Sequence, residues 1–198
     1  MINNLDKFTA ASVIQLVESI EPGCGDSLKV LIPIMSCHEV DKNKTLFHAG
    51  QENRFEYLLL DGLLRSLILD EKGNETTVAF HSAPCVVTPC IARSEYSKSL
   101  VSCESIQTSR IVRFSENGLL DLMRKDENAS RWGNRVMQTE LIRRSQREWS
   151  LAAESGAQRL ERFEREFPDV ASVVSAKILA TYLGITPVTL SRLRHTVR

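Results

Sequence analysis

The hydrophobic residues change their spacing near residue 115, and this change constrains the fold more than any other feature of the chain. From about 37 to 114, short runs rich in β-branched and aromatic residues alternate with turn residues. Runs of this kind, at a spacing of roughly ten residues, are typical of antiparallel sandwiches and barrels. After 115, apolar residues recur at three- and four-residue steps, which indicates helices. The 198 residues are therefore expected to form a β unit followed by helices.

Two turn signals divide the β region. Asp61-Gly62 lies between apolar runs and predicts a tight hairpin, because a type I′ turn needs positive φ. Asp70–Asn74 predicts a second turn. Helices are expected before this region, at Ala10–Ile20 and Ser27–Met35. The predicted strands are Thr45–His48, Tyr57–Leu60, Leu63–Leu69, Thr76–Phe80 and Ile111–Phe114.

A long amphipathic helix is expected after the β region. Ser115 can cap a short helix, Ser130 can cap the long one, and Arg159–Phe167 forms a further helix that Pro168 ends. The long helix needs a cover for its apolar stripe, either a second copy of itself or its own β domain, and the two arrangements are compatible. The stripe consists of Met137, Leu141, Ser145, Trp149 and Ala152.

The last residues have the pattern of a helix-turn-helix. Ala176–Leu183 is helical, Gly184 can end it in the left-handed conformation, and Thr186-Pro187 suits the start of a second helix. In this motif the second helix lies in the major groove, and Arg192 can donate two bonds to a guanine edge. The alternative is a helical hairpin within a core. Candidates for base contacts are Thr186, Pro187, Val188, Ser191 and Arg192, and further DNA-contact candidates are Ser175, Thr189, Arg194, His195 and Arg198.

The charge distribution favours a basic module at this end of the chain. Residues 1–130 hold 13 Lys and Arg against 18 Asp and Glu, a net charge of −5, and residues 131–198 hold 12 against 7, a net charge of +5. A basic module attracts nucleic acid, although a solvated surface would have the same composition. No apolar run approaches 18 residues, and the start is polar, so neither a membrane span nor a signal peptide is expected. The expected location is the cytoplasm.

Three stretches resemble the Crp/Fnr family of bacterial transcription regulators. Cys37-His38 leading to Thr45–Gln51 resembles the opening strands of its cyclic-nucleotide-binding fold, and Tyr57–Arg65 with Asp70–Glu75 resembles its central hairpins. Val174–Arg194 resembles its helix-turn-helix. The resemblance covers residues 28–195. It implies an α+β chain with three parts: a jelly-roll sensor domain (1–129), a dimerisation helix (130–155) and a helix-turn-helix domain (156–198).

The resemblance also implies partners and a mechanism. The partners are double-stranded DNA with a palindromic site, a second copy bound through residues 130–153, a small-molecule effector of unknown identity, and RNA polymerase, with no membrane and no enzymatic activity. An effector would change the placement of the two recognition helices, with a hinge near Glu154–Gly156. Val188 stands where many members carry Glu, so the preferred DNA sequence is expected to differ.

The sensor region departs from the family pattern. Cyclic-nucleotide-binding members hold the phosphate with a Gly-Glu pair and an Arg about ten residues later. At these positions the chain has Thr88-Pro89 and then Lys98 or Ser99. Because proline lacks a backbone donor and the ribose carboxylate is missing, cAMP or cGMP is not expected to bind in the usual way, and no cofactor is expected. Arg93 and Lys98 are candidates for binding another anion, or they simply face solvent.

The cysteines and histidines leave two other readings open. Five cysteines stand at positions 24, 37, 85, 90 and 103, an odd number that does not suggest a disulfide framework. Cys85 and Cys90, with His81, could form a redox or metal pair, or could be small buried side chains. His48 and His81 are the only pair that could support a cupin-like metal or small-molecule-binding protein. Alternatively, the chain is a sensor module whose terminal helices bind protein rather than DNA.

Overall fold

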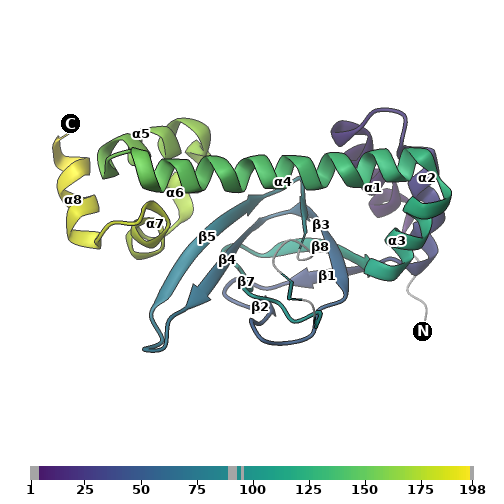
Figure 1. The fold of residues 1–198 in the computed structure, drawn as a ribbon, viewed down its shortest axis with the longest axis horizontal. Coiled ribbons are helices and arrows are strands. Elements are labelled where there is room, and N and C mark those ends of the chain that lie inside the picture. The colour runs from purple at the N-terminus through teal and green to yellow at the C-terminus, as the bar shows by residue number, and fades with distance from the viewer. Residues whose placement is uncertain (1–4, 89–92, 95, 197–198) are drawn as a thin grey trace.

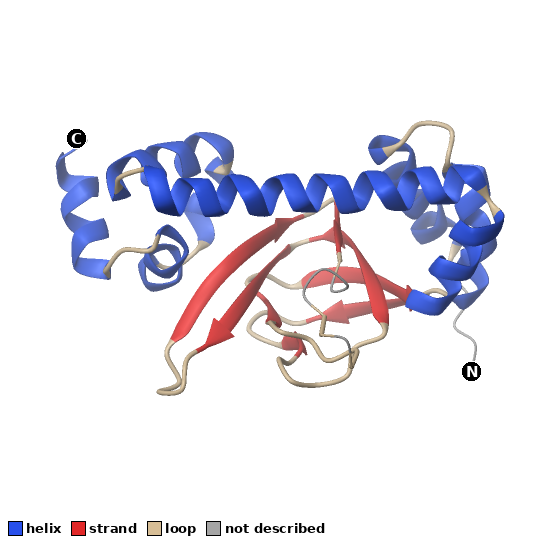
Figure 2. Ribbon diagram, viewed as in Figure 1, coloured by secondary structure: helices blue, strands red, loops and turns tan. Residues whose placement is uncertain are grey.

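The computed structural model describes residues 5–88, 93–94 and 96–196. Within them the chain forms two antiparallel β-sheets and a set of helices, so the expected α+β class is confirmed. Figure 1 shows the long helix α4 running along the top of the sheets, with α1 to α3 at one end and α5 to α8 at the other. Figure 2 shows that the strands are gathered below the middle of α4. None of the described helices is both long and apolar enough to cross a membrane.

The two sheets pack face to face as a sandwich. One has the strand order β1-β8-β3-β6 and the other β2-β7-β4-β5, and the pairings are antiparallel. Their shared interior holds Phe47, Tyr57, Leu59, Leu64 and Ile111. The strands are β1 (Ser36–Val40), β2 (Thr45–Phe47), β3 (Phe55–Asp61), β4 (Leu63–Leu69), β5 (Glu75–Ser82), β6 (Cys85–Val87), β7 (Ser102–Ser105) and β8 (Ser109–Ser115).

The hairpin expected at Asp61-Gly62 is wrong, because β3 and β4 belong to different sheets. Gly62 instead forms the corner at which the chain passes from one sheet to the other, with φ +96°. A Cβ there would lie 2.6 Å from the carbonyl oxygen of Thr108 and would also meet Ser109. The turn expected at Asp70–Asn74 does join a hairpin, formed by β4 and β5. The Asp70 carboxylate accepts from the backbone N–H groups of Lys72 and Asn74, each at 2.8 Å.

Helices cover the outer face of the β1-β8-β3-β6 sheet. They are α1 (Lys7–Ile20), α2 (Gly25–Leu28), α3 (Glu116–Lys125) and the first half of α4 (Glu127–Ala153). The helical region expected over Ser27–Met35 is confirmed, but it is not one continuous α-helix: α2 is followed by a 3-10 helix, η1 (Lys29–Ile34), with Pro33 inside it. Because proline cannot donate the backbone bond of an α-helix, it favours this short irregular geometry.

The long helix α4 has 27 residues, which corresponds to a length of about 40 Å. It begins at Glu127, and Ser130 does not cap it, because the Asp126 carboxylate accepts from the Ala129 N–H at 2.8 Å. Trp132, which is 1% exposed, fixes the first half of α4 to the core beneath it. After α4 come α5 (Gly156–Glu166), α6 (Pro168–Val173), α7 (Ala176–Leu183) and α8 (Pro187–Thr196).

The C-terminal helices form a core of their own that also contacts the sheets. Phe80 of β5 packs against Phe163 of α5 and Tyr182 of α7, with ring centroids 5.6 and 4.9 Å apart. The Thr181 hydroxyl accepts from the Thr77 N–H at 3.2 Å. Contacts with β5, in addition to the chain connection through α4, therefore fix the position of the C-terminal helices relative to the sheets.

Replacing Gly62 by Ala should destabilise the protein by about 2 kcal/mol or more, because positive φ and the contact with Thr108 both oppose a Cβ. Gly73→Ala is the matched control: its φ is +79°, but its Cβ would meet nothing within 4 Å, so only about 1 kcal/mol of backbone strain is expected. Urea denaturation measures both. Equal losses of unfolding free energy in the two variants would contradict the claim that Gly62 is required by its contact with Thr108.

Candidate nucleic-acid interface

The turn between α7 and α8 has the geometry of a helix-turn-helix. The Ser175 hydroxyl caps α7 by accepting from the Ile178 N–H at 3.3 Å. Gly184 ends α7 in the left-handed conformation, with φ 65° and ψ 35°. Leu179, Ala180 and Leu183 are buried on the inner side of α7. Ala180 belongs to the same buried cluster as Leu190 of α8, and its small side chain lets α7 pack closely there. This packing fixes the orientation of α8 relative to α7.

The second helix of the motif, α8, is anchored by one face only. Thr186 caps it, because its hydroxyl accepts from the Thr189 N–H at 3.1 Å, and Pro187 occupies the first helical position, where no donor is needed. Leu190 is 1% exposed and Leu193 is half-buried. The inner face of α8 is thus held by leucines at a spacing of three residues.

The outer face of α8 carries most of the residues expected to contact DNA. Val188 is 60% exposed although it is apolar, so it is available to a partner surface. Arg194 is half-buried, and its Nε lies 3.5 Å from a carboxylate oxygen of Glu164, so this cation already has an anionic neighbour. Arg198 lies outside the described residues. The exposed expected contacts are Ser175, Thr186, Pro187, Val188, Thr189, Ser191, Arg192 and His195.

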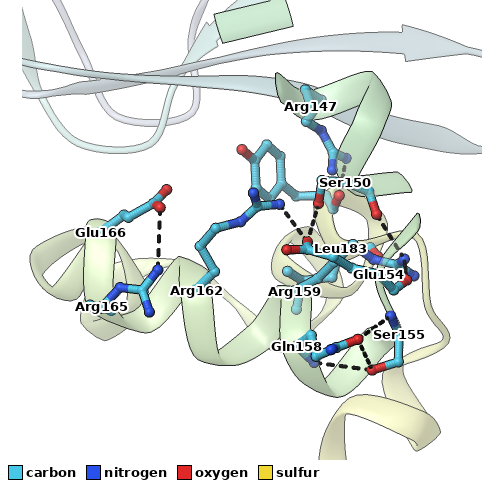
Figure 3. Close-up of polar contacts among 11 residues, drawn as sticks. Arg147, Ser150, Glu154, Ser155, Gln158, Arg159, Arg162, Arg165, Glu166 and Leu183 are labelled. Atoms are coloured by element: carbon cyan, nitrogen blue, oxygen red, sulfur yellow. Dashed lines mark hydrogen bonds and ion pairs between the residues drawn. The ribbon is translucent and has the colours of Figure 1, made fainter. Parts of the chain in front are cut away.

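A network of arginines fixes the C-terminal helices to the end of α4 (Figure 3). Arg159 of α5 donates to the backbone carbonyl of Leu183 at 2.7 Å and also to the carbonyl of Glu154. Arg147 of α4 donates to the carbonyl of Tyr182, and its guanidinium lies 4.1 Å from the centre of that ring. Each of these carbonyls lies at a helix C-terminus, where backbone acceptors lack intrahelical donors and cations are favoured.

A third arginine completes this network. Arg162 donates to the Glu154 carboxylate at 2.6 Å. Burial lowers the pKa of Arg147, and the neighbouring Arg159, Arg162 and Arg143 lower it further. The capping role of these arginines was not predicted from the sequence. Arg147 and Arg159 donate to backbone carbonyls of residues distant in the sequence, and no local pattern in the sequence signals such contacts.

The chain bends at Glu154 as expected from the sequence. Ser155 caps α5, and Gln158 completes a capping box by accepting from the Ser155 N–H at 2.9 Å. A Cβ on Gly156 would lie 2.8 Å from the side chain of Ile185. Position 156 therefore favours glycine because the space beside it is filled. The structure thus shows a break between two helices, and hinge motion there stays a prediction.

The residues expected to line an effector pocket are only partly brought together. Arg93 is buried and paired with Glu56 at 2.9 Å and with Glu116, so its guanidinium stabilises the protein's own carboxylates. Lys98 is exposed, and the Ser99 hydroxyl is buried and donates to the carbonyl of Val101 at 2.6 Å. Pro89 lies outside the described residues. Thr88 does line a cavity.

That cavity, of about 330 Å³, lies between the interior of the sandwich and α4. Ser66 and His81 line it from the sheets, and Glu140 and Arg143 line it from α4. His81 Nε2 lies 2.9 Å from the Ser66 hydroxyl. Burial lowers the pKa of the His81 imidazole to about 4, so this ring is neutral at pH 7. Of these lining residues, Thr88 was expected from the sequence, whereas Ser66 and Glu140 were not.

The structure does not support the hypotheses of a metal site at His48 and His81 or of a redox pair at Cys85 and Cys90. His48 is exposed, whereas His81 is half-buried and lines the cavity beside α4. Burial raises the pKa of the Cys85 thiol to about 12, so it is a poor nucleophile, and Cys90 lies outside the described residues. Among the residues that the structure describes, no group of three or more His, Cys, Asp and Glu side chains could hold a metal ion.

Comparisons with known proteins show which proteins this chain resembles in sequence and in fold. No family model matches it. The fumarate and nitrate reduction regulatory proteins of Salmonella typhi and Escherichia coli K12 are each 26% identical to it over 165 residues, which is 78% of this chain. A Eubacterium rectale protein assigned to the Crp/Fnr family of transcriptional regulators has the same fold, with a TM-score of 0.70, 17% identity, and coverage of 86% of this chain and 82% of that one. The chain is thus similar in sequence to these regulatory proteins, and its fold is that of a Crp/Fnr-family regulator.

Two further solved structures share the Crp/Fnr fold. FixK2 from Bradyrhizobium japonicum has a TM-score of 0.73 at 19% identity, covering 83% of this chain and 84% of that one. The c-di-GMP-responsive regulator CLP of Xanthomonas campestris has a TM-score of 0.71 at 13% identity, covering 87% and 90%. The match spans 65% of the length of the curated relatives. The resemblance to Crp/Fnr regulators is confirmed: the curated relatives are regulatory proteins, and the solved structures share the fold.

Replacing Arg159 by Met should destabilise the C-terminal helices by about 2–3 kcal/mol, because it leaves the carbonyls of Glu154 and Leu183 without their charged donor. Arg165→Met, on the same helix, removes a side chain that is 69% exposed and should change stability by less than about 0.5 kcal/mol. Thermal unfolding of both variants tests this. A similar stability for the two would contradict the capping role.

Proposed function

We propose that this chain is a dimeric transcription regulator that binds specific DNA sequences through α8, and that it is not an enzyme. The observation that carries the proposal is the outer face of α8. It is exposed, it contains Arg192 and no acidic residue, and the opposite face is held in place by the buried Leu190 and the half-buried Leu193. The curated relatives are named as regulatory proteins, which supports the same function here.

The residues of α8 suit entry into the major groove. In a helix-turn-helix the N-terminal part of the second helix contacts base edges, which here places Val188 and Arg192 against the bases. Arg192 can donate two bonds to guanine, and Val188 can contact a thymine methyl group. Ser175, Thr189 and Arg194 suit phosphates, with Arg198 following α8 in the sequence. Releasing Arg194 from Glu164 costs little, because the two side chains are 39% and 43% exposed and solvent screens the pair.

A second copy of the chain is the proposed cover for α4. Leu141, Ile142 and Trp149 are 54%, 51% and 59% exposed in the single chain. Ser145 and Ala152 are exposed on the same side of the helix, as the periodicity predicts. A contiguous apolar stripe of this kind marks an interaction surface, and two copies packed along 130–153 would bury it symmetrically. The twofold axis then places the two α8 helices on successive turns of one duplex.

The sensor pocket is proposed to be degenerate. Arg93 is occupied by Glu56 and Glu116, so it is not available to neutralise a cyclic phosphate, and Thr88 contributes only a hydroxyl. cAMP is therefore not expected to bind in the usual way. A different small-molecule effector, RNA polymerase as a partner, and a cytoplasmic location without membrane association complete the proposal.

Replacing Arg192 by Ala should weaken binding to a cognate duplex by about 1–3 kcal/mol and relax the base preference at one position. The duplex is first selected from random sequences. Arg165→Ala removes the same charge from α5 and should have a much smaller effect, since Arg165 lies outside the helix-turn-helix. Fluorescence anisotropy at several salt concentrations measures both variants. Equal losses on every sequence would argue against base reading by Arg192.

Replacing Leu141 by Glu should convert a dimer into a monomer, because it places two like charges in a desolvated stripe. Leu69→Glu is the control: Leu69 is 57% exposed on β4, away from α4, so the dimer should persist. Analytical ultracentrifugation distinguishes the species. A monomeric wild-type protein, or a dimer that both variants retain, would contradict the proposed interface.

A further inference from the structure

A second cavity lies outside the sandwich, between the outer face of the β1-β8-β3-β6 sheet and the helices α3 and α4. Its volume is about 310 Å³. The lining is almost entirely apolar, with Val86 and Phe114 from the sheet, Leu119 and Met123 from α3, and Val136 from α4. Its position differs from that of the His81 cavity, which opens into the interior of the sandwich.

Two buried polar atoms of this lining lack a hydrogen-bond partner among the described residues. They are Oε2 of Glu56 and Nε1 of Trp132. Glu56 is 4% exposed and Trp132 is 1% exposed, so bulk water does not compensate them. Leaving a buried donor or acceptor unpaired costs about 1–3 kcal/mol, and more for a charged group. Two such atoms in the lining of one cavity indicate that something else satisfies them.

The charges at this cavity select the ligand. Glu56 and Glu116 line it, and Arg93 neutralises one of the two carboxylates. The polar end therefore carries a net charge of about −1 when both carboxylates are ionised, which disfavours phosphates and carboxylates. Burial raises the pKa of Glu56 to about 7, so this carboxyl can also hold a proton near neutral pH.

Size and shape limit the ligand further. A volume of 310 Å³ lies at the lower end of the range for small-molecule pockets, and is about twice that of an engineered cavity that holds benzene. One or two rings would fit. Leu120 of α3, which is 40% exposed, is the most accessible residue of the lining, so the entrance lies beside it.

We propose that this cavity binds a small aromatic amine or alcohol. The rings fill the apolar part, the amino or hydroxyl group donates to Glu56, and an acceptor atom or the edge of the ring system receives the Trp132 N–H. Because Gly133 and Val136 of α4 and Leu119 of α3 line one site, the bound molecule bridges the two helices. The proposal is independent of DNA binding, and its test needs no DNA.

The first experiment uses simple probes on the full chain. 2-Phenylethylamine and benzyl alcohol should bind saturably by calorimetry, and benzoate should not, because its carboxylate would face Glu56 and Glu116. The chain has two tryptophans, so a ¹H–¹⁵N spectrum shows two indole signals, and Trp149→Phe assigns them. The Trp132 signal should shift on binding. Absence of saturable binding by both probes, or a shift of the Trp149 signal alone, would overturn the proposal.

Variants test the location. Val136→Phe fills the cavity and should weaken 2-phenylethylamine binding at least tenfold. Val30→Phe makes the same enlargement in η1, at a side chain that is 63% exposed and outside the lining, and should leave binding unchanged. Glu56→Gln keeps the size of the side chain and should weaken the amine more than the alcohol, which keeps the test decisive if the larger residue impairs folding. Unchanged amine affinity in Glu56→Gln would overturn the assigned contact.

Discussion

The arrangement of this protein depends on one helix that is fixed at its two ends to different cores. At its start, α4 buries Trp132 and Ala129 against the core formed with α1 to α3. At its end, Arg147 and Ser150 contact the C-terminal helices and the loop that leads to them. Because an α-helix of 27 residues is stiff, these two anchors set the distance between the sandwich and α8.

The arginines of the C-terminal half have two different roles. Arg147, Arg159 and Arg162 are partly buried and donate to helix C-termini or to Glu154, so their charge stabilises the protein itself. Arg192 is exposed on α8, where an anionic partner can approach. The charge of +5 over 131–198 therefore overstates what is available to DNA. The position of each guanidinium, and not the total, supports the proposed interface.

Local signals in the sequence were sufficient where the deciding contacts are local. Gly184, Thr186 and Pro187 predict the helix-turn-helix because a left-handed residue, a cap and a first-turn proline act within a few residues of one another. The Asp70–Asn74 turn is of the same kind.

Sequence-based predictions failed where contacts between residues distant in the sequence decide the structure. Asp61-Gly62 has the composition of a hairpin, yet the packing of Gly62 against Thr108 places it at a corner between the sheets. Arg93 resembled a free cation until Glu56 and Glu116 were placed beside it. Asp126 replaced Ser130 as the cap because either residue type can accept from the first turn of a helix.

The central claim is that α8, aimed by α4 and by a second copy of the chain, reads the sequence of a DNA duplex. Selection of binding sites from random duplex DNA by the purified protein tests this directly. The account predicts enrichment of an inverted repeat whose half-sites are centred about one helical turn, roughly 34 Å, apart. Recovery of unrelated sequences, or of a single unrepeated half-site, would contradict it.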